Sequence, residues 1–78
     1  MKVTLLTPEK TLFEGQATFV EVPGAKGRFQ MLDHHAPIVS ILSAGKVRIV
    51  LPDNSEKLFD IQGGVIELKN DIITILAE

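Results

Sequence analysis

Residues 46–51 read KVRIVL, and this alternation of charged and apolar side chains decides the fold. In an extended chain, Val47, Ile49 and Leu51 point to one side, whereas Lys46 and Arg48 point to the other. The period of two residues predicts a β-strand with one buried face.

A second stretch, GVIELK at 64–69, has the same period, with Ile66 and Leu68 on its apolar face. It is followed by Asn70 and Asp71, two residue types that tolerate the positive φ of tight hairpin turns. The sequence therefore predicts a hairpin around these two residues. A similar turn is expected at 52–55, PDNS, after the first strand.

Glycine and proline interrupt the chain along its whole length. They leave runs of about five to eight residues, a length typical of strands. Val, Ile and Thr, which suit a pleated surface, make up 20 of the 78 residues. We expect about nine short strands in a single domain over residues 1–78. The predicted fold class is all-β, a small antiparallel β-sandwich with two packed sheets, short turns and no substantial helix.

The composition restricts the classes of function. The chain has 78 residues, a formal net charge of −2 and no cysteine, which excludes disulfide bonds and thiolate metal sites. All four aromatic residues are Phe, and acidic residues outnumber basic ones, which disfavours a nucleic-acid-binding surface. We find neither a signal peptide nor an apolar run of the roughly twenty residues that cross a bilayer. Any membrane association is therefore expected to come through a partner.

Three motifs suggest chemistry, and each has a simpler structural interpretation. Asp33-His34-His35 contains metal-ligand residue types, but neighbours in an extended chain point to opposite faces and do not readily share one ion. The stretch 24–28, GAKGR, lacks the Gly-Lys-Ser/Thr ending and the following helix of a phosphate-binding loop. Gly63-Gly64 is better interpreted as a bulge. We predict no catalytic residues, no metal site and no cofactor.

The stretch 72–76, IITIL, is apolar on both faces. Val50 and Val65 likewise lie on strand faces that are otherwise charged. Such a strand is either covered on both sides within the domain or faces a partner, and the sequence leaves both alternatives open.

Three segments carry a family resemblance. The first is 7–15, TPEKTLFEG; the second is 22–32, VPGAKGRFQML, leading into His35-Ala36-Pro37-Ile38; the third is 63–67, GGVIE, followed by 74–78, TILAE. In this order and spacing they resemble the amino-terminal β-sandwich domain of the epsilon subunit of F-type ATP synthases. The resemblance extends from Lys2 to Glu78 without a gap.

The chain departs from that family's pattern at a few positions. Gln30 stands where family members usually carry Gly, and Asp33-His34 stands where they carry Pro-Gly. The Asp-His-His motif thus results from two substitutions beside the family's His35-Ala36-Pro37. A typical member also continues beyond the equivalent of Glu78 into a two-helix domain. We expect either a naturally short subunit or a shortened form of a longer one, and in both cases residues 1–78 lack this helical hairpin and the inhibition for which it is used.

The resemblance implies a non-catalytic subunit of the central stalk, or rotor, that links the gamma subunit to the c-ring and couples ion-driven rotation to ATP synthesis. It implies no cofactor, no nucleic acid and no homo-oligomer. It also implies a peripheral location on the cytoplasmic face of the inner (plasma) membrane, reached through the complex. The residues expected to face the c-ring are Arg28, Phe29 and His35. Those expected to face gamma are Thr7, Ser40, Leu42 and Gln62.

Other classes of function stay open. A biotinyl- or lipoyl-type carrier domain is also a small β-structure, but it needs a lysine at a tight hairpin tip, commonly beside Met. Neither Met1 nor Met31 adjoins such a lysine. A small metal-dependent hydrolase would be built on Asp33-His34-His35. Another binding module with a β-sandwich fold is the remaining alternative.

Overall fold

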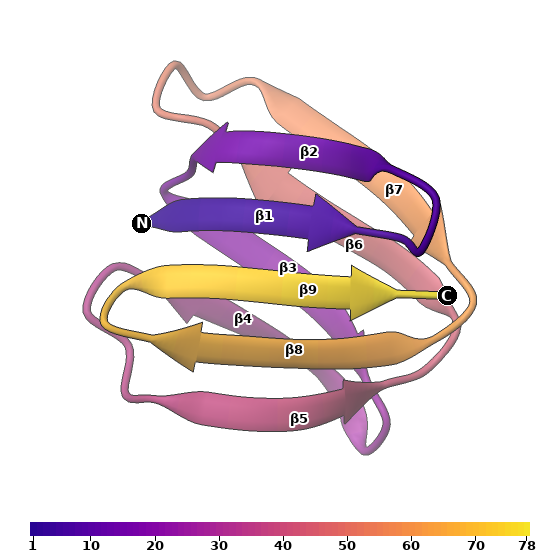
Figure 1. The fold of residues 1–78 in the computed structure, drawn as a ribbon. Coiled ribbons are helices and arrows are strands. Elements are labelled where there is room, and N and C mark those ends of the chain that lie inside the picture. Colours follow the sequence, from indigo (N-terminus) through magenta and orange to yellow (C-terminus); the bar gives the residue numbers. More distant parts are fainter.

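The computed structural model describes residues 1–78 and consists of nine strands without a helix (Figure 1). The strands are β1 (Lys2–Leu6), β2 (Thr11–Gln16), β3 (Phe19–Gly24), β4 (Gly27–Leu32), β5 (Ile38–Leu42), β6 (Gly45–Val50), β7 (Glu56–Ile61), β8 (Gly64–Lys69) and β9 (Ile72–Ala77). The prediction of an all-β fold of short strands is confirmed. No helix with the length and apolar character needed to cross a membrane is present.

The strands form one sheet that curls back on itself, so that its two halves face each other as the layers of a sandwich (Figure 1). The front layer contains β2, β1, β9, β8 and β5 in that order, and the back layer contains β4, β3, β6 and β7. All pairs are antiparallel, as predicted, except β1 with β9, which is parallel. β2 pairs with one edge of β1, and β9 pairs with the other edge. The hairpin between β8 and β9 reverses the chain, so that β9 runs in the same direction as β1.

The layers are joined at a corner where β5 runs into β6. Leu42 pairs with Gly24 of β3, and this is the only residue pair between β3 and β5. Two backbone bonds fix the corner: the Ala25 amide donates to the Ile41 carbonyl at 2.9 Å, and the Ser43 amide donates to the Pro23 carbonyl at 2.7 Å. These bonds hold the chain at the point where it leaves β5 in the front layer and enters β6 in the back layer.

The predicted turns form as expected. Asn70 and Asp71 have φ values of 53° and 62° between β8 and β9. In the turn between β6 and β7, Asn54 has a φ of 69°, and the Ser55 amide donates to the Asp53 carboxylate at 2.9 Å. Bonds from the Ser55 hydroxyl and amide hold the pKa of Asp53 below its usual value.

The core between the layers consists of 16 buried hydrophobic residues and contains no buried polar residue. The predicted inward faces are confirmed, since Val47, Ile49, Ile66 and Leu68 are all buried. Leu51, predicted on the same face, follows the end of β6 and is half-buried against the core. On the side where β2 and β7 are the outermost strands, the rings of Phe13 and Phe59 lie with centroids 6.2 Å apart and close the gap between the layers. The result is a domain with a fully apolar interior and two outer sheet faces of different character.

Candidate docking surfaces

The outer face of the front layer carries a continuous row of exposed apolar side chains. Residues that pair directly across neighbouring strands lie side by side on the same face. Val65 in β8 pairs with Ile41 in β5 and with Leu76 in β9, and Leu76 in turn pairs with Leu6 in β1. Ile41 is 67% exposed, Leu76 is 54% exposed and Val65 is exposed, whereas Leu6 at the end of the row is half-buried. We call Leu6, Ile41, Val65 and Leu76 the apolar row.

The apolar row answers the question raised by the doubly apolar stretch 72–76. Ile73 and Ile75 are buried in the core, whereas Ile72 and Leu76 stay exposed on the opposite face of β9. No segment of the domain covers that face (Figure 1). Contiguous exposed apolar surface of this kind marks protein docking sites, so this face is the best candidate for a partner interface.

The outer face of the back layer is charged, and its charges are paired within the domain. Arg48 donates to both carboxylate oxygens of Glu56, at 3.0 and 3.2 Å, and its guanidinium lies 5.1 Å from the Phe19 ring centroid. Their hydrogen bonding raises the pKa of Arg48 and lowers that of Glu56. Lys46 pairs with Asp60 at 2.9 Å. Apolar side chains also lie on this face, because Leu32 in β4 pairs with Phe19 in β3, which pairs with Val50 in β6, and Leu32 is 56% exposed. The outer face of the back layer is therefore mixed, with paired charges beside a short apolar row.

The residues expected to face the c-ring all lie along β4, but they do not form one cluster. Arg28 and Phe29 are at the beginning of β4, whereas His35 follows its other end. β4 pairs only with β3, so its second edge is free. A contact that included all three residues would therefore run along this free edge.

The side chains of these three residues have different surroundings. The Arg28 guanidinium donates to the Lys46 carbonyl at 2.9 Å and lies 3.4 Å from the Glu21 carboxylate, so it is engaged on the back-layer face. Phe29 is half-buried and packs against the core. His35 is exposed, and its Nδ1 lies 2.7 Å from the Ala36 carbonyl oxygen. Of the three, His35 is the freest to contact a partner.

The residues expected to face gamma lie around the apolar row. Thr7 directly follows Leu6, and its hydroxyl bonds with the backbone of Lys10 in the turn after β1. Gln62 follows β7 and is exposed, and its backbone amide donates to the Glu78 backbone carbonyl at 3.1 Å. Thr7 thus follows β1 and Gln62 precedes β8, two strands that contribute to the row, and both residues are exposed or partly exposed.

The other two residues of that set are in β5. Ser40 pairs with the buried Ile66, which places its side chain on the inner side of the strand, where it is partly exposed. Leu42 is 3% exposed and belongs to the core. Its side chain packs between the two layers, so it does not lie on the outer surface where a partner would dock. The neighbouring Ile41, which sequence reasoning missed, is the residue of β5 that points outward in the row.

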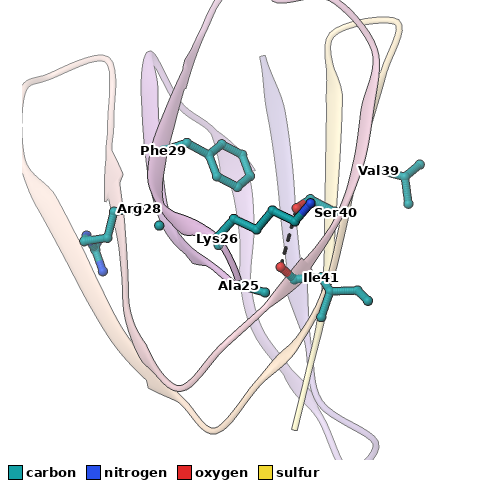
Figure 2. A pocket seen from close by; sticks show the side chains of 9 residues that line it. Ala25, Lys26, Arg28, Phe29, Val39, Ser40 and Ile41 are labelled. Atoms are coloured by element: carbon teal, nitrogen blue, oxygen red, sulfur yellow. Dashed lines mark hydrogen bonds between the residues drawn. The ribbon is translucent and has the colours of Figure 1, made fainter.

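A groove lies between the β3–β4 turn and β5, with a volume of about 630 Å³ (Figure 2). Phe29 and Lys26 line it from one side, and Val39, Ser40 and Ile41 line it from the other. Lys26 is at the tip of a tight hairpin, the position at which a carrier domain presents its modified lysine. Its neighbours are Ala25 and Gly27, however, rather than the Met that commonly flanks such a lysine.

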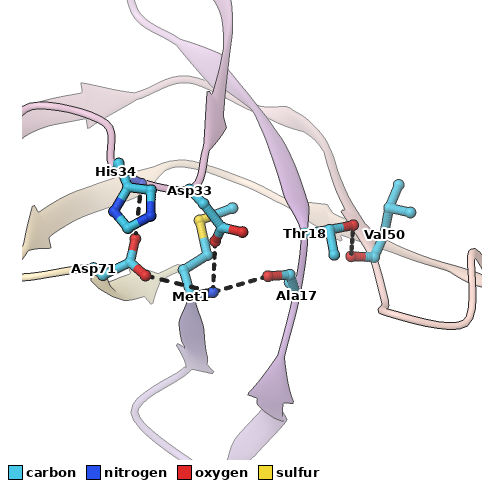
Figure 3. Close-up of polar contacts among 7 residues, drawn as sticks. All are labelled: Met1, Ala17, Thr18, Asp33, His34, Val50 and Asp71. Atoms are coloured by element: carbon cyan, nitrogen blue, oxygen red, sulfur yellow. Dashed lines mark hydrogen bonds and ion pairs between the residues drawn. The ribbon is translucent and has the colours of Figure 1, made fainter.

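The Asp33-His34-His35 motif is not arranged as a metal site. Asp33 binds the Met1 ammonium, and the His34 amide donates to Asp71 (Figure 3). No group of three or more His, Asp or Glu side chains comes close enough together to hold an ion. The structure thus gives the hypothesis of a metal-dependent hydrolase no support.

Comparison with known proteins adds to this geometry. A family model described as "ATP synthase, Delta/Epsilon chain, beta-sandwich domain" matches residues 1–78. The ATP synthase epsilon chain of Chlorobium limicola is 42% identical over 77 residues, which cover 99% of this chain and 88% of the relative. These matches do not favour a carrier domain.

Two solved structures show a similar fold. One chain in the Euglena gracilis mitochondrial ATP synthase, resolved as OSCP/F1/c-ring, superposes with a TM-score of 0.89 at 16% identity, over 96% of this chain and 48% of that one. A chain in the central stalk/c-ring structure of the Tetrahymena thermophila mitochondrial ATP synthase gives a TM-score of 0.83 at 17% identity, over 97% of this chain and 61% of that one.

Proposed function

Because the chain belongs to the family of ATP synthase delta and epsilon chain β-sandwich domains, we propose that it is the epsilon-type subunit of an F-type ATP synthase rotor. It performs no catalysis itself. It joins the gamma subunit to the c-ring, so that ion-driven rotation of the ring reaches the catalytic head and drives ATP synthesis. Besides membership of the family, the structural observation that supports this proposal is the apolar row on one outer face.

We propose that gamma docks on the apolar row. Stable interfaces bury about 800 Å² on each partner, which is about a sixth of the 4706 Å² surface of this domain. One outer face of the front layer can supply such an area, with the row at its centre and Thr7 and Gln62 at its rim. This arrangement of an apolar centre within a polar rim is typical of protein interfaces.

We propose that the c-ring contact runs along the free edge of β4, from Arg28 and Phe29 to His35. The edge presents unpaired backbone groups as well as side chains, because alternate residues of an edge strand direct their amides and carbonyls away from the sheet. Both support a polar contact with loops at the surface of the ring. The docking face for gamma and the edge for the ring belong to different layers.

A rotor adaptor has to transmit force without deforming. The domain has 48 backbone–backbone hydrogen bonds over 78 residues, and its two layers are tied at the β5–β6 corner. Paired strands and a close-packed apolar core resist deformation. In this proposal, residues 1–78 act as one stiff domain between gamma and the ring.

The complex to which epsilon chains belong is membrane-associated. We propose that this chain is peripheral, on the cytoplasmic face of the inner (plasma) membrane, and that it is held there by the ring and gamma rather than by lipid. The ion pairs on the outer face of the back layer support an orientation in which that face stays largely in water.

The experiment is co-purification from native membranes with tagged full-length chain. The expected result is recovery of gamma and the c-ring in detergent extract. Recovery of the chain as a lone, folded monomer from membranes that contain an intact ATP synthase would refute the proposal.

Arg28→Gln tests the ring contact. Gln removes the charge without placing a second carboxylate beside Glu21, so the domain is expected to stay folded. If Arg28 binds the ring, proton-driven ATP synthesis in membrane vesicles falls while ATP hydrolysis continues. Unchanged coupling would remove Arg28 from the contact and leave the β4 edge to Phe29 and His35.

A further inference from the structure

The second edge of β4 presents backbone groups that have no partner in the domain. On the far side of β3, the Pro23 carbonyl accepts a hydrogen bond from the Ser43 amide at 2.7 Å, so the backbone of Pro23 faces away from β4. Pro23 pairs with Arg28, and two antiparallel residues paired in this way both direct their backbone groups outward. By alternation along the strand, Arg28, Gln30 and Leu32 direct their amides and carbonyls to the free edge.

Only one of these groups is used within the domain. The Leu32 carbonyl accepts a hydrogen bond from the His35 amide at 3.3 Å. The amides of all three residues, and the carbonyls of Arg28 and Gln30, bond to no other strand or loop. Such an edge is a template for pairing with another chain. Extended peptides bind to many proteins in this way, as an additional strand of a sheet.

The free edge of β4 opens into the groove between the β3–β4 turn and β5. The bond from the Ala25 amide to the Ile41 carbonyl joins the two layers at one end of this opening. Beyond it, β4 pairs with β3 alone. Phe29 and Val39 line the groove from opposite sides, and Val39 is 71% exposed. Apolar side chains therefore border the space that an additional strand would enter.

The two faces of β4 determine which sequence pattern would fit beside it. Met31 is buried and Phe29 packs against the core, whereas Arg28, Gln30 and Leu32 are exposed. Residues that pair across neighbouring strands lie on the same face of the sheet. In an added strand, the residues opposite Phe29 and Met31 would point into the groove, and the residues between them would point to solvent. The segment that fits therefore alternates apolar and polar residues.

The charge at the beginning of this edge is positive. The Lys26 side chain extends along the groove (Figure 2) and forms no ion pair in the domain. An acidic residue of an incoming strand would find this cation without a competing partner. β4 itself, with the sequence GRFQML, contains no acidic residue, so a second copy of this strand would not supply the matching charge. Charge complementarity of this kind fixes the direction in which a partner binds.

We propose that the free edge of β4 binds an extended segment of a protein partner, with alternate apolar side chains in the groove and acidic residues at the end near Lys26. The segment runs antiparallel to β4, which is the more stable pairing per residue. The inference goes beyond the ring contact proposed for the same edge and does not depend on it, because the segment binds the chain in the absence of the ring. A bound segment covers the backbone groups of the edge, so it and the ring would exclude each other.

The test adds a synthetic peptide, Thr-Ile-Thr-Ile-Thr-Glu-Glu with acetylated and amidated ends, to the full chain and measures hydrogen exchange. Without peptide, the amides of Gln30 and Leu32 should exchange fast, and those of Phe29 and Met31 slowly. At millimolar peptide, exchange at Gln30 and Leu32 should slow about tenfold or more, while the β6–β7 hairpin keeps its rates. Unchanged exchange at both edge amides would overturn the proposal.

Modified peptides locate the bonds and the charge. In the proposed register the central Thr lies opposite Gln30 and donates its amide to β4, whereas the amide of the preceding Ile faces away. N-methylation of that Thr should weaken binding about tenfold or more, and N-methylation of that Ile should leave it almost unchanged. Replacing both Glu by Lys should weaken binding about two- to tenfold. Equal binding by the two methylated peptides would contradict strand addition, and equal binding by the Glu and Lys peptides would contradict the acidic end.

Gln30→Pro removes the corresponding amide from the chain. That amide does not bond to β3, and proline is tolerated in an edge strand, so the domain is expected to fold. Gln30→Ala is the matched control, because it keeps the amide. Peptide binding should be lost in Gln30→Pro and kept in Gln30→Ala, and binding by both would refute the proposal. If Gln30→Pro does not fold, the methylated peptides decide. Slow exchange at Gln30 in concentrated chain without peptide would mean that a second copy occupies the edge, which also refutes the proposal.

Discussion

Replacing Leu76 in the apolar row by Thr should weaken binding of gamma without unfolding the domain. Leu58 in β7 provides a matched control, because it is 56% exposed where Leu76 is 54% exposed, yet it lies in the other layer. Both residues are in strands, and Thr is well tolerated in a strand. We therefore expect Leu76→Thr and Leu58→Thr to change the free energy of unfolding by less than about 1 kcal/mol each.

The size of the binding effect follows from the exposed half of the side chain. Burying a whole Leu side chain is worth about 1.5–3 kcal/mol, so the half that only a partner can cover is worth about 1 kcal/mol. The Thr hydroxyl, if left without a hydrogen-bond partner in the interface, costs roughly 0.5–2 kcal/mol more. Together these terms predict that Leu76→Thr raises Kd for gamma roughly ten- to a hundredfold.

The assay is isothermal titration calorimetry of each variant against purified gamma, with Tm measured in parallel. Leu58→Thr should bind like the parent chain. The binding heat capacity of the parent should be negative, as burial of apolar surface requires, and smaller in magnitude for Leu76→Thr. Equal losses of affinity in the two variants, or none in either, would refute the assignment of the apolar row as the gamma interface.

Three further predictions concern stability. The folded-state pKa of Asp33 is lowered, so its stabilising contribution is present above the ordinary value of 3.8 and is lost as pH falls through the folded-state pKa. Urea unfolding between pH 7 and pH 2 should show this loss of stability in acid for the parent chain and a smaller loss for Asp33→Ala. Gly45→Ala should destabilise by about 1–3 kcal/mol, since φ is 155° and an added Cβ would lie 2.9 Å from a proline ring atom in β3. Gly27→Ala shares the backbone strain, because φ is 127°, but its Cβ meets no atom within 4 Å, so Gly45→Ala should cost more than Gly27→Ala by the clash with the proline. Ile75→Ala should lower the free energy of unfolding by about 2–5 kcal/mol because it opens a cavity in the core, and Ile72→Ala, on the exposed face of the same strand, by clearly less.

Local patterns in the sequence were enough to predict the strands and several turns. The alternation in 46–51 predicts the buried residues of β6, and Asn70-Asp71 predicts the positive φ of the β8–β9 turn. Both features depend on a few neighbouring residues. Period, propensity and turn chemistry act at that range, so a single sequence carries them.

Features that depend on long-range register could not be predicted in the same way. The apolar row exists because Val65 pairs with Ile41 on one side and Leu76 on the other, and because Leu76 pairs with Leu6 near the opposite end of the chain. A shift of any of these pairings by one residue would turn the side chains to the other face. The exposed Ile72 and Leu76 were foreseeable as an unusual apolar face, whereas Ile41 gave no local signal.

The two outer faces of the domain differ in what they offer to the proposed gamma interface. On the back layer, Arg48 binds Glu56 and approaches Glu21, so a partner's charges would have to displace existing pairs. Such displacement gains little, because exposed ion pairs are worth at most about 1 kcal/mol and the exchange replaces one pair by another. On the front layer, Ile41 and Leu76 are apolar and have no ion pair to lose, and covering them releases water from apolar surface. The back layer has apolar side chains too, in the row of Leu32, Phe19 and Val50, but they lie beside these ion pairs. The longer apolar row of the front layer is free of such pairs, which favours the front layer as the proposed gamma interface.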